Sequence, residues 1–467
     1  MEELIPISFI DLNPVIISDP SENPDITDPL IVEQVVNAIG KGAYRSVKKI
    51  LEYIVPAYIQ KGKLNPLVPI IHLRISGDGR NVGRKVKHVM ITIALLDDPT
   101  KLFESNYHYT TVLFPGTENY STLKIATNDL IQELQELSNT GMIINNIFWK
   151  FELFFSSDWK FLAICLGFNA ANSNYFCPWC QIAKNQCGDG QIEWKISKSM
   201  SILNENPTAY PGHNLPPLFN MISLDNHIPD KLHIMLRVTD RLWELMLQEI
   251  KNEGLFNDIT RNIIIQEMKD LKIHFEFWKI RDTDNWSYTS LMGDDKLCVL
   301  RRFNLAKLFD LEHATLIKNL WDGFAELYDL LGEKETDPQH FRLKAKAWYE
   351  LFLKKTVVDS ETNTILVQGL YRSSDLTPYI YVLVSHVWEF MLKHQRWGLN
   401  AFSCSAVEKK NHDHVCYFFR KSLKNGGKFQ HKTSAIREIL EHENRLFFYT
   451  QNDVPFLYSK PQHIHIT

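Results

Sequence analysis

The sequence lacks the features that mark membrane, secreted and strongly basic proteins. Its 467 residues contain no run of 18 apolar residues, so a transmembrane helix is not expected. The seven cysteines are odd in number and irregularly spaced, which fits a reducing compartment better than a disulfide framework. The first residues are acidic and lack the basic segment of a secretory signal. The net charge of −4 argues against a uniformly basic protein.

Length and composition indicate a large protein with an extensive core. The chain is long enough for about three domains, and its 45% hydrophobic and 12% aromatic residues can fill such cores. We expect a helical lead-in, the first part of a mixed α/β core, a region with a cysteine pair and a helical insertion, and C-terminal helices that complete the core. The expected boundaries are 1–66, 67–180, 181–370 and 371–467.

Positive charge is concentrated in two segments despite the negative total. Residues 74–88 contain five Lys or Arg against one acid, and residues 409–437 contain eight against one. A charge run is usually a solvated surface. Because both segments adjoin the acidic residues discussed below, a phosphate-binding surface is the competing interpretation.

The most informative stretch runs from Phe151 to Cys180. Residues 147–155 are aromatic and β-branched, as in a buried strand. Asp158 follows at once, where the strand ends, and residues 159–166 continue as an apolar helix. A carboxylate at the end of a rigid core strand is well placed for chemistry.

A CPWC motif closes this stretch. Its cysteines, Cys177 and Cys180, have the CxxC spacing that lets two thiolates face one metal ion. The alternative is a reduced, packed cysteine pair.

The order of elements around this stretch favours one fold class. A strand ending at Asp78 precedes two further strands, a helix, the strand before Asp158 and another helix. This β-β-β-α-β-α order indicates an α/β, ribonuclease-H-like mixed sheet, in which the first and fourth strands are neighbours and Asp78 meets Asp158. A large helical insertion then precedes the last helix. The first three strands of this order are expected at 68–81, 89–96 and 109–114, and the helix after them at 129–137. Further helices are expected at 32–39, 47–54 (disturbed by Pro56) and 377–393, and from Ala406.

Paired carboxylates need a cation. Asp78 and Asp158 would repel each other, and one would take up a proton unless Mg²⁺ bridged them. Phosphodiester chemistry uses two such metals about 4 Å apart, and a third acid completes the set of ligands. Glu408 is the best candidate, because it opens the last helix and has Lys409 and Lys410 beside it.

These residues resemble the DDE transposase superfamily, in particular the branch of Transib transposases and the V(D)J recombinase catalytic core, with hAT transposases more distant. Four segments carry the resemblance: SGDGRN, the stretch from SSDWKF to CPWC, PDKLHIMLRVTDRLWELM, and PYIYVLVSHVWEFM followed by SAVEKKNHDHVCYFFRK. The resemblance implies catalytic, metal-binding Asp78, Asp158 and Glu408, which would hold two Mg²⁺ or Mn²⁺ ions. It also implies a structural Zn²⁺ on Cys177, Cys180 and histidines of the late helix.

The zinc pattern departs from the family in one place. His386 matches the second histidine of the family's HxxxxH, but the first falls on Tyr381, a poor zinc ligand. The site would then have three protein ligands, recruit His233 or Cys187, or hold no metal.

Three further histidines invite roles near substrate. The resemblance places His233 near the active site, as a contact to the scissile phosphate or a flipped base; a capping histidine is the alternative. His412 follows Glu408 by four residues and shares its helix face, so it would contact substrate; a surface role is the alternative. His414 follows on the same helix.

Two functions follow as expectations. The first is a metal-dependent DNA transposase or recombinase-like enzyme that hydrolyses a phosphodiester and transfers the freed strand. The second is a domesticated or decayed relative that binds nucleic acid or protein without cutting. For the first, DNA is the expected partner, with binding that weakens steeply with salt, together with a homodimer, a nuclear location, no membrane and no small-molecule cofactor.

Overall fold

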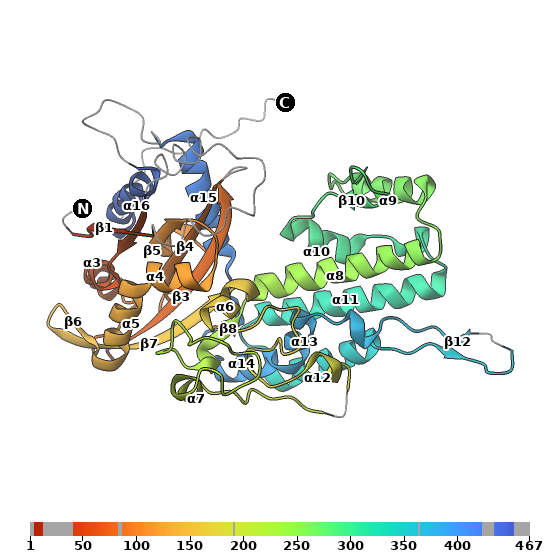
Figure 1. Ribbon diagram of the computed structural model, residues 1–467, viewed down its shortest axis with the longest axis horizontal. Helices are drawn as coiled ribbons and strands as arrows, with labels where there is room; N and C mark the ends of the chain where they lie inside the picture. Colours follow the sequence, from red (N-terminus) through yellow and green to blue (C-terminus); the bar gives the residue numbers. More distant parts are fainter. Residues whose placement is uncertain are drawn as a thin grey trace. The chain divides into compact units, whose positions relative to one another are not determined.

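The computed structural model describes residues 4–12, 41–82, 86–189, 192–362, 365–422 and 434–452. Within it the chain divides into two compact units. The first comprises residues 1–169, 199–228 and 404–467, and the second comprises residues 170–198 and 229–403. Figure 1 shows the elements of both.

The first unit is built on a mixed sheet of eight strands among the described residues, in the order β1-β2-β5-β4-β3-β7-β6, with β8 paired to β7. β3 is antiparallel to β4, and β4 to β5, whereas β3 and β7 are parallel. The predicted adjacency of the first and fourth core strands is therefore confirmed. The strands are β1 (Ile7–Ile10), β2 (Gly42–Arg45), β3 (Ile70–Val82), β4 (Val86–Leu95), β5 (Tyr109–Pro115), β6 (Met142–Ile144), β7 (Ile147–Ser157) and β8 (His227–Pro229).

Helices cover both faces of this sheet. One face packs on the last two helices, where Met90 and Leu113 of the sheet meet Val407 and Ile439. The opposite face carries Tyr44, whose hydroxyl interacts with Glu133. The helices of this unit are α3 (Val47–Gln60), α4 (Tyr120–Ala126), α5 (Asn128–Thr140), α6 (Trp159–Cys165), α7 (Met200–Glu205), α15 (Ser405–Arg420) and α16 (Ala435–Gln451).

The N-terminal region differs from the expected helical lead-in. β1 pairs with β2, and β2 pairs with β5, so the region extends the sheet. The expected helix at 32–39 lies outside the described residues. Pro56 lies inside α3, which continues to Gln60; packing of the buried face of α3 outweighs the one hydrogen bond that proline removes.

The sequence predicted that the strand ends at Asp78, and this prediction is wrong. β3 continues to Val82 because β4 pairs with it from Leu73 onward, and Asp78 lies opposite Met90. Since paired residues point to the same face, Asp78 faces the layer of α15 and α16 that covers Met90.

The second unit is mainly helical. α8 and α11 lie side by side (Figure 1), and Trp243, Phe303 and Trp321 pack at their interface with ring centroids 5.4–6.3 Å apart. Its elements are α8 (Lys231–Asn252), α9 (Asp258–Asp270), β9 (Phe277–Lys279), β10 (Trp286–Tyr288), α10 (Gly293–Arg302), α11 (Leu311–Gly332), α12 (Pro338–Phe352), β11 (Val357–Val358), β12 (Ile365–Val367), α13 (Pro378–Ser385) and α14 (Val387–Lys393).

A buried cluster of charged groups fixes α15 on the sheet. Glu443 of α16 accepts hydrogen bonds from Lys410 Nζ at 2.9 Å, His414 Nε2 at 2.6 Å and the guanidinium of Arg45, and all four side chains are buried. Burial alone would raise the pKa of Glu443, but the charges of Lys410 and Arg45 and the bond from His414 hold it well below its usual range. The carboxylate therefore stays ionised and holds α15 in place.

Removing this carboxylate should strongly destabilise the first unit. We predict that Glu443→Ala costs roughly 3–5 kcal/mol of unfolding free energy, because two buried cations lose their counter-charge. Glu441→Ala on the same helix breaks only the peripheral pair with Arg437 and should cost about 1 kcal/mol or less. Urea unfolding followed by circular dichroism measures both. Equal losses in the two variants would contradict the role assigned to Glu443.

Candidate carboxylate site and metal centre

Asp78 on β3 and Asp158 at the end of β7 occupy matching positions relative to the parallel pairing of these strands. β3 and β7 pair with a constant offset of 80 residues, ending at Ile75↔Phe155, and each aspartate follows that last pair by three positions. Ser157 Oγ donates a hydrogen bond to Gly77 O at 2.5 Å, joining the two strands beside the aspartates. The structure thus brings these two predicted residues together.

The backbone of β7 turns into α6 at Asp158. Asp158 is the N-cap of this helix, and its Oδ1 accepts a hydrogen bond from Phe161 N at 2.7 Å, which satisfies one of the open N–H groups of the first turn. The ring of Phe161 packs so closely on Gly77 that a Cβ there would lie 2.1 Å from it. Glycine at this position lets α6 approach β3, and it fixes the end of α6 that carries Asp158.

Glu408 lies in the first turn of α15, close enough to Asp78 for its charge to act on that carboxyl. Its charge and that of Asp158 act on Asp78. The N-terminus of α15 is anchored at Cys404, whose sulfur contacts the guanidinium of Arg74 at 3.5 Å and lies 3.6 Å from Ser156 O. Strands β3 and β7 therefore both determine where Glu408 lies.

The electrostatics of the site centre on Asp78. Burial raises the pKa of its carboxyl to about 7, opposed by the hydrogen bond from Asn411 and reinforced by the charges of Glu408, Asp158 and Glu118. Carboxylates gathered in this way repel one another, which is the condition that a divalent cation relieves.

Glu118 is a member of this acidic group that sequence reasoning missed. It lies between β5 and α4, its Oε2 is paired with Lys160 Nζ at 3.0 Å, and it packs so closely on Gly79 that a Cβ there would lie 2.0 Å from its Oε1. No periodicity or motif marks it in the sequence. Only the second glycine of SGDG hints that another group approaches the strand there.

His233 belongs to the second unit, at the start of α8. Its Nδ1 lies 2.5 Å from Asp230 Oδ2, and Asp230 is the N-cap that accepts hydrogen bonds from Leu232 N and His233 N. These contacts are those of the capping histidine that the sequence offered as the alternative role.

The histidines after Glu408 have different environments. His414 is buried against Glu443. His412 is exposed, with Nε2 3.4 Å from Cys416 Sγ on the next turn.

The two basic segments are only partly available as surface. Arg74 is buried on Ser76 and Cys404, and Lys410 is buried on Glu443, so neither can contact DNA. Residues 83–85 and 423–433, which hold further basic residues, lie outside the described residues. The exposed basic side chains in the described part are Arg80, Lys87, Lys409, Arg420 and Lys421.

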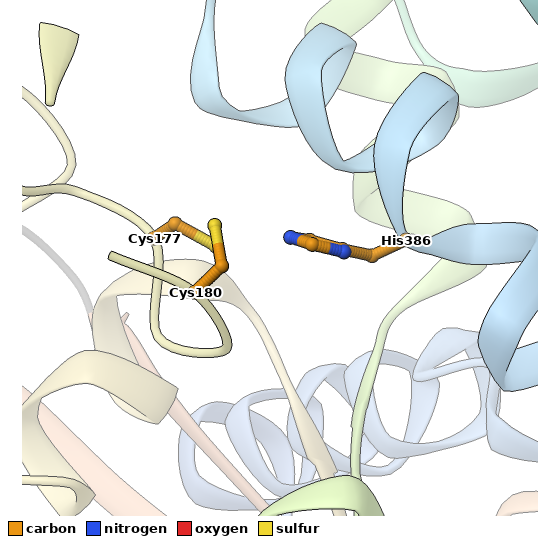
Figure 2. Close-up of side chains that lie close together, drawn as sticks. All are labelled: Cys177, Cys180 and His386. Carbon is orange, nitrogen blue, oxygen red and sulfur yellow. The ribbon is translucent and has the colours of Figure 1, made fainter. Parts of the chain in front are cut away.

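Cys177, Cys180 and His386 form a compact group in the second unit. One ligand atom from each lies within 4.8 Å of the others, and all three side chains are buried. Figure 2 shows the imidazole directed at the two thiols. His386 is the residue between α13 and α14, where the helix breaks. The described residues hold no other such group of His, Cys, Asp and Glu.

Neighbouring groups orient these candidate ligands. Glu389 lies 3.0 Å from His386 Nδ1 and also accepts a hydrogen bond from Ile196 N, so the carboxylate, once bonded to Nδ1–H, leaves Nε2 for the thiols. Burial alone would raise the pKa of Cys180, yet hydrogen bonds from Cys177 and His386 lower it to about 4. Burial alone would lower the pKa of His386, but its hydrogen bonds to Cys180 and Glu389 raise it, so the imidazole shares a proton with the thiolate. Zinc bound in place of that proton would meet a thiolate and an imidazole backed by a carboxylate, which is a donor set that fits zinc.

Tyr381 lies next to this group. Its hydroxyl lies 3.1 Å from Cys180 Sγ, and burial, with the neighbouring thiols, holds its pKa above the usual range. A phenol that keeps its proton is a weak ligand, so it acts as a hydrogen-bond partner of the sulfur. The described cluster includes neither His233 nor Cys187, which the sequence offered as substitutes.

Neutralising Asp78 should stabilise the metal-free protein in a pH-dependent way. The pKa of Asp78 is about 7 in the folded chain and about 3.9 when unfolded, so folding becomes less favourable as pH rises between these values. Asp78→Asn should therefore stabilise the protein more at pH 8 than at pH 5, by about 1–3 kcal/mol. Unfolding in EDTA at both pH values measures this, and a pH-independent effect would contradict it.

Restoring a histidine should strengthen the metal centre. We predict that Tyr381→His tightens Zn²⁺ binding, because a fourth nitrogen ligand replaces a phenol. A titration of wild type and variant against a chelator measures the change. Cys180→Ser is the control and should weaken binding in both backgrounds. Unchanged affinity in Tyr381→His would show that this corner is already filled or that the group holds no zinc.

Comparisons with known proteins give no family for this chain, so a functional assignment rests on the geometry described above. No protein family model matches the chain, and no curated protein matches it. Among the described residues, no helix combines the length and apolar character needed to cross a bilayer.

Proposed function

We propose that this chain is a metal-dependent DNA-cleaving and strand-transferring protein of the DDE transposase type, built on a ribonuclease-H-like sheet. One observation carries the proposal. Asp78, Asp158 and Glu408, which the sequence singled out, lie in one unit. The pKa of Asp78 is raised first by burial and further by the charges of Glu408 and Asp158.

The acidic group fits divalent cations by its chemistry. Carboxylate oxygens are the ligands of Mg²⁺ and Mn²⁺, and Asp78, Asp158, Glu408 and Glu118 would supply them. Two such ions, when bound, would stabilise charge on the attacking and leaving oxygens of a phosphodiester.

The protein's own part is to hold these carboxylates at a fixed spacing. The parallel pairing of β3 and β7 positions the two aspartates, and the buried Glu443 cluster positions the helix that bears Glu408. Lys160 pairs with Glu118 and neutralises only part of the negative charge of the acidic group.

DNA contacts would come from exposed cations near the site. Lys409 follows Glu408 on α15, and Arg80 follows Asp78 by two residues, so both stand next to an acidic ligand candidate. Contacts of this kind bind the phosphate backbone irrespective of sequence.

The thiol–imidazole group would have a structural role. It lies in the second unit and joins the CPWC segment to the junction of α13 and α14. Zinc held there would stabilise that unit without taking part in the reaction.

The test is a nicking assay on supercoiled plasmid. We predict cleavage that requires Mn²⁺ and is lost in Asp158→Asn and Glu408→Gln. Asparagine is chosen at 158 because it can keep the N-cap bond to Phe161 N while removing the charge. Glu441→Gln, in the same unit but outside the acidic group, is the matched control and should cut like wild type.

The failures are distinguishable. Cleavage that survives both substitutions and EDTA would overturn the proposal. DNA binding without cleavage in the wild-type chain would instead favour a non-catalytic, domesticated relative.

A further inference from the structure

Asn411 connects the acidic group to the interior of the first unit. It is completely buried on α15. Its Nδ2 donates a hydrogen bond to Asp78 Oδ2 at 2.6 Å, and its Oδ1 is paired with His88 Nε2. An amide has one donor end and one acceptor end, so this orientation requires a proton on His88 Nε2 and presents only N–H to Asp78.

His88 is held in the form that this arrangement needs. It is buried on β4, opposite Arg80 of β3, and its ring meets the edge of His414 at 6.3 Å. Burial lowers the pKa of His88 to about 4, opposed by its bond to Asn411 and reinforced by the charges of His414 and Arg80. A neutral imidazole with one N–H can serve as a fixed donor at physiological pH.

The position of Asn411 on its helix gives these bonds a function. Asn411 follows Glu408 by three residues, so the two side chains leave α15 on the same face. Glu408 is directed to the acidic group and acts on Asp78 electrostatically, while Asn411 bonds Asp78 directly. One turn of helix therefore fixes Glu408 and the carboxylate of Asp78 relative to each other.

We propose that Asn411 is a positioning residue, which orients the carboxylate of Asp78 against Glu408 before a divalent cation binds, and that His88 fixes the orientation of its amide. This role rests on the proposed function, because it concerns the same acidic group. Residues that orient metal ligands in this way change metal affinity by 10–100-fold when they are replaced.

The test measures Mn²⁺ affinity by electron paramagnetic resonance, without DNA. Asn411→Leu, which keeps the size but removes both bonds, should weaken binding by about 10-fold or more. Asn139→Ala, an exposed asparagine on α5, is the matched control and should bind like wild type. Circular dichroism and thermal unfolding show whether each variant is folded.

A second pair of variants separates positioning from packing. His88→Gln keeps an N–H donor near the position of Nε2 and should retain affinity close to wild type, whereas His88→Ala should lose it. In an Asp78→Asn background, Asn411→Leu should have no further effect, because the group on which Asn411 acts has been replaced. The two His88 variants also decide the question if Asn411→Leu does not fold.

Each outcome bears on one proposal. Wild-type chain that binds no Mn²⁺ would overturn the proposed function and the positioning role with it. Mn²⁺ binding that is unchanged in Asn411→Leu, or lost equally in His88→Gln and His88→Ala, would overturn the positioning role and leave the proposed function standing.

Discussion

The first unit depends on one buried carboxylate. Glu443 neutralises Arg45 from β2 and Lys410 from α15 in a place that water does not reach. Buried charges of this kind are tolerated only when they are paired and hydrogen-bonded. The same contacts decide how α15 lies on the sheet. Because α15 carries both Glu408 and Asn411, the geometry of the acidic group follows from an interaction on the far side of that helix.

The sheet supplies the other half of the site. Parallel pairing of β3 with β7 runs to Ile75 and Phe155, three residues before Asp78 and Asp158, and Gly77 lets Phe161 of α6 pack against β3. Burial and mutual repulsion of the acids destabilise the folded protein when no cation is bound, and binding of a divalent ion would offset that loss. This arrangement is typical of a functional site and supports the proposed chemistry.

The second unit has a separate organising centre. Cys177 and Cys180 come from a loop, and His386 comes from a helix break about 200 residues later. Their side chains meet because Glu389 holds the imidazole and Lys198 Nζ donates to Cys177 O at 2.8 Å. Two buried thiols that face an imidazole could hold a metal ion, and the structural role we propose for the group rests on this donor set.

The sequence by itself determined the strands and helices around Asp78 and Asp158 and the CxxC pair, because period-2 and period-3.6 patterns and motif spacing are local properties. The order of those elements predicted that the strands before Asp78 and Asp158 are neighbours, whereas the pairing of the thiols with His386 was implied only by the family resemblance. Only the tertiary structure revealed Glu118, the buried state of Arg74 and Lys410, and the bonds of Asn411. The sequence around a charged residue does not show whether its side chain is solvated or paired with a buried partner. A partner hundreds of residues away leaves no local pattern. Which residues surround the site is therefore a property of packing.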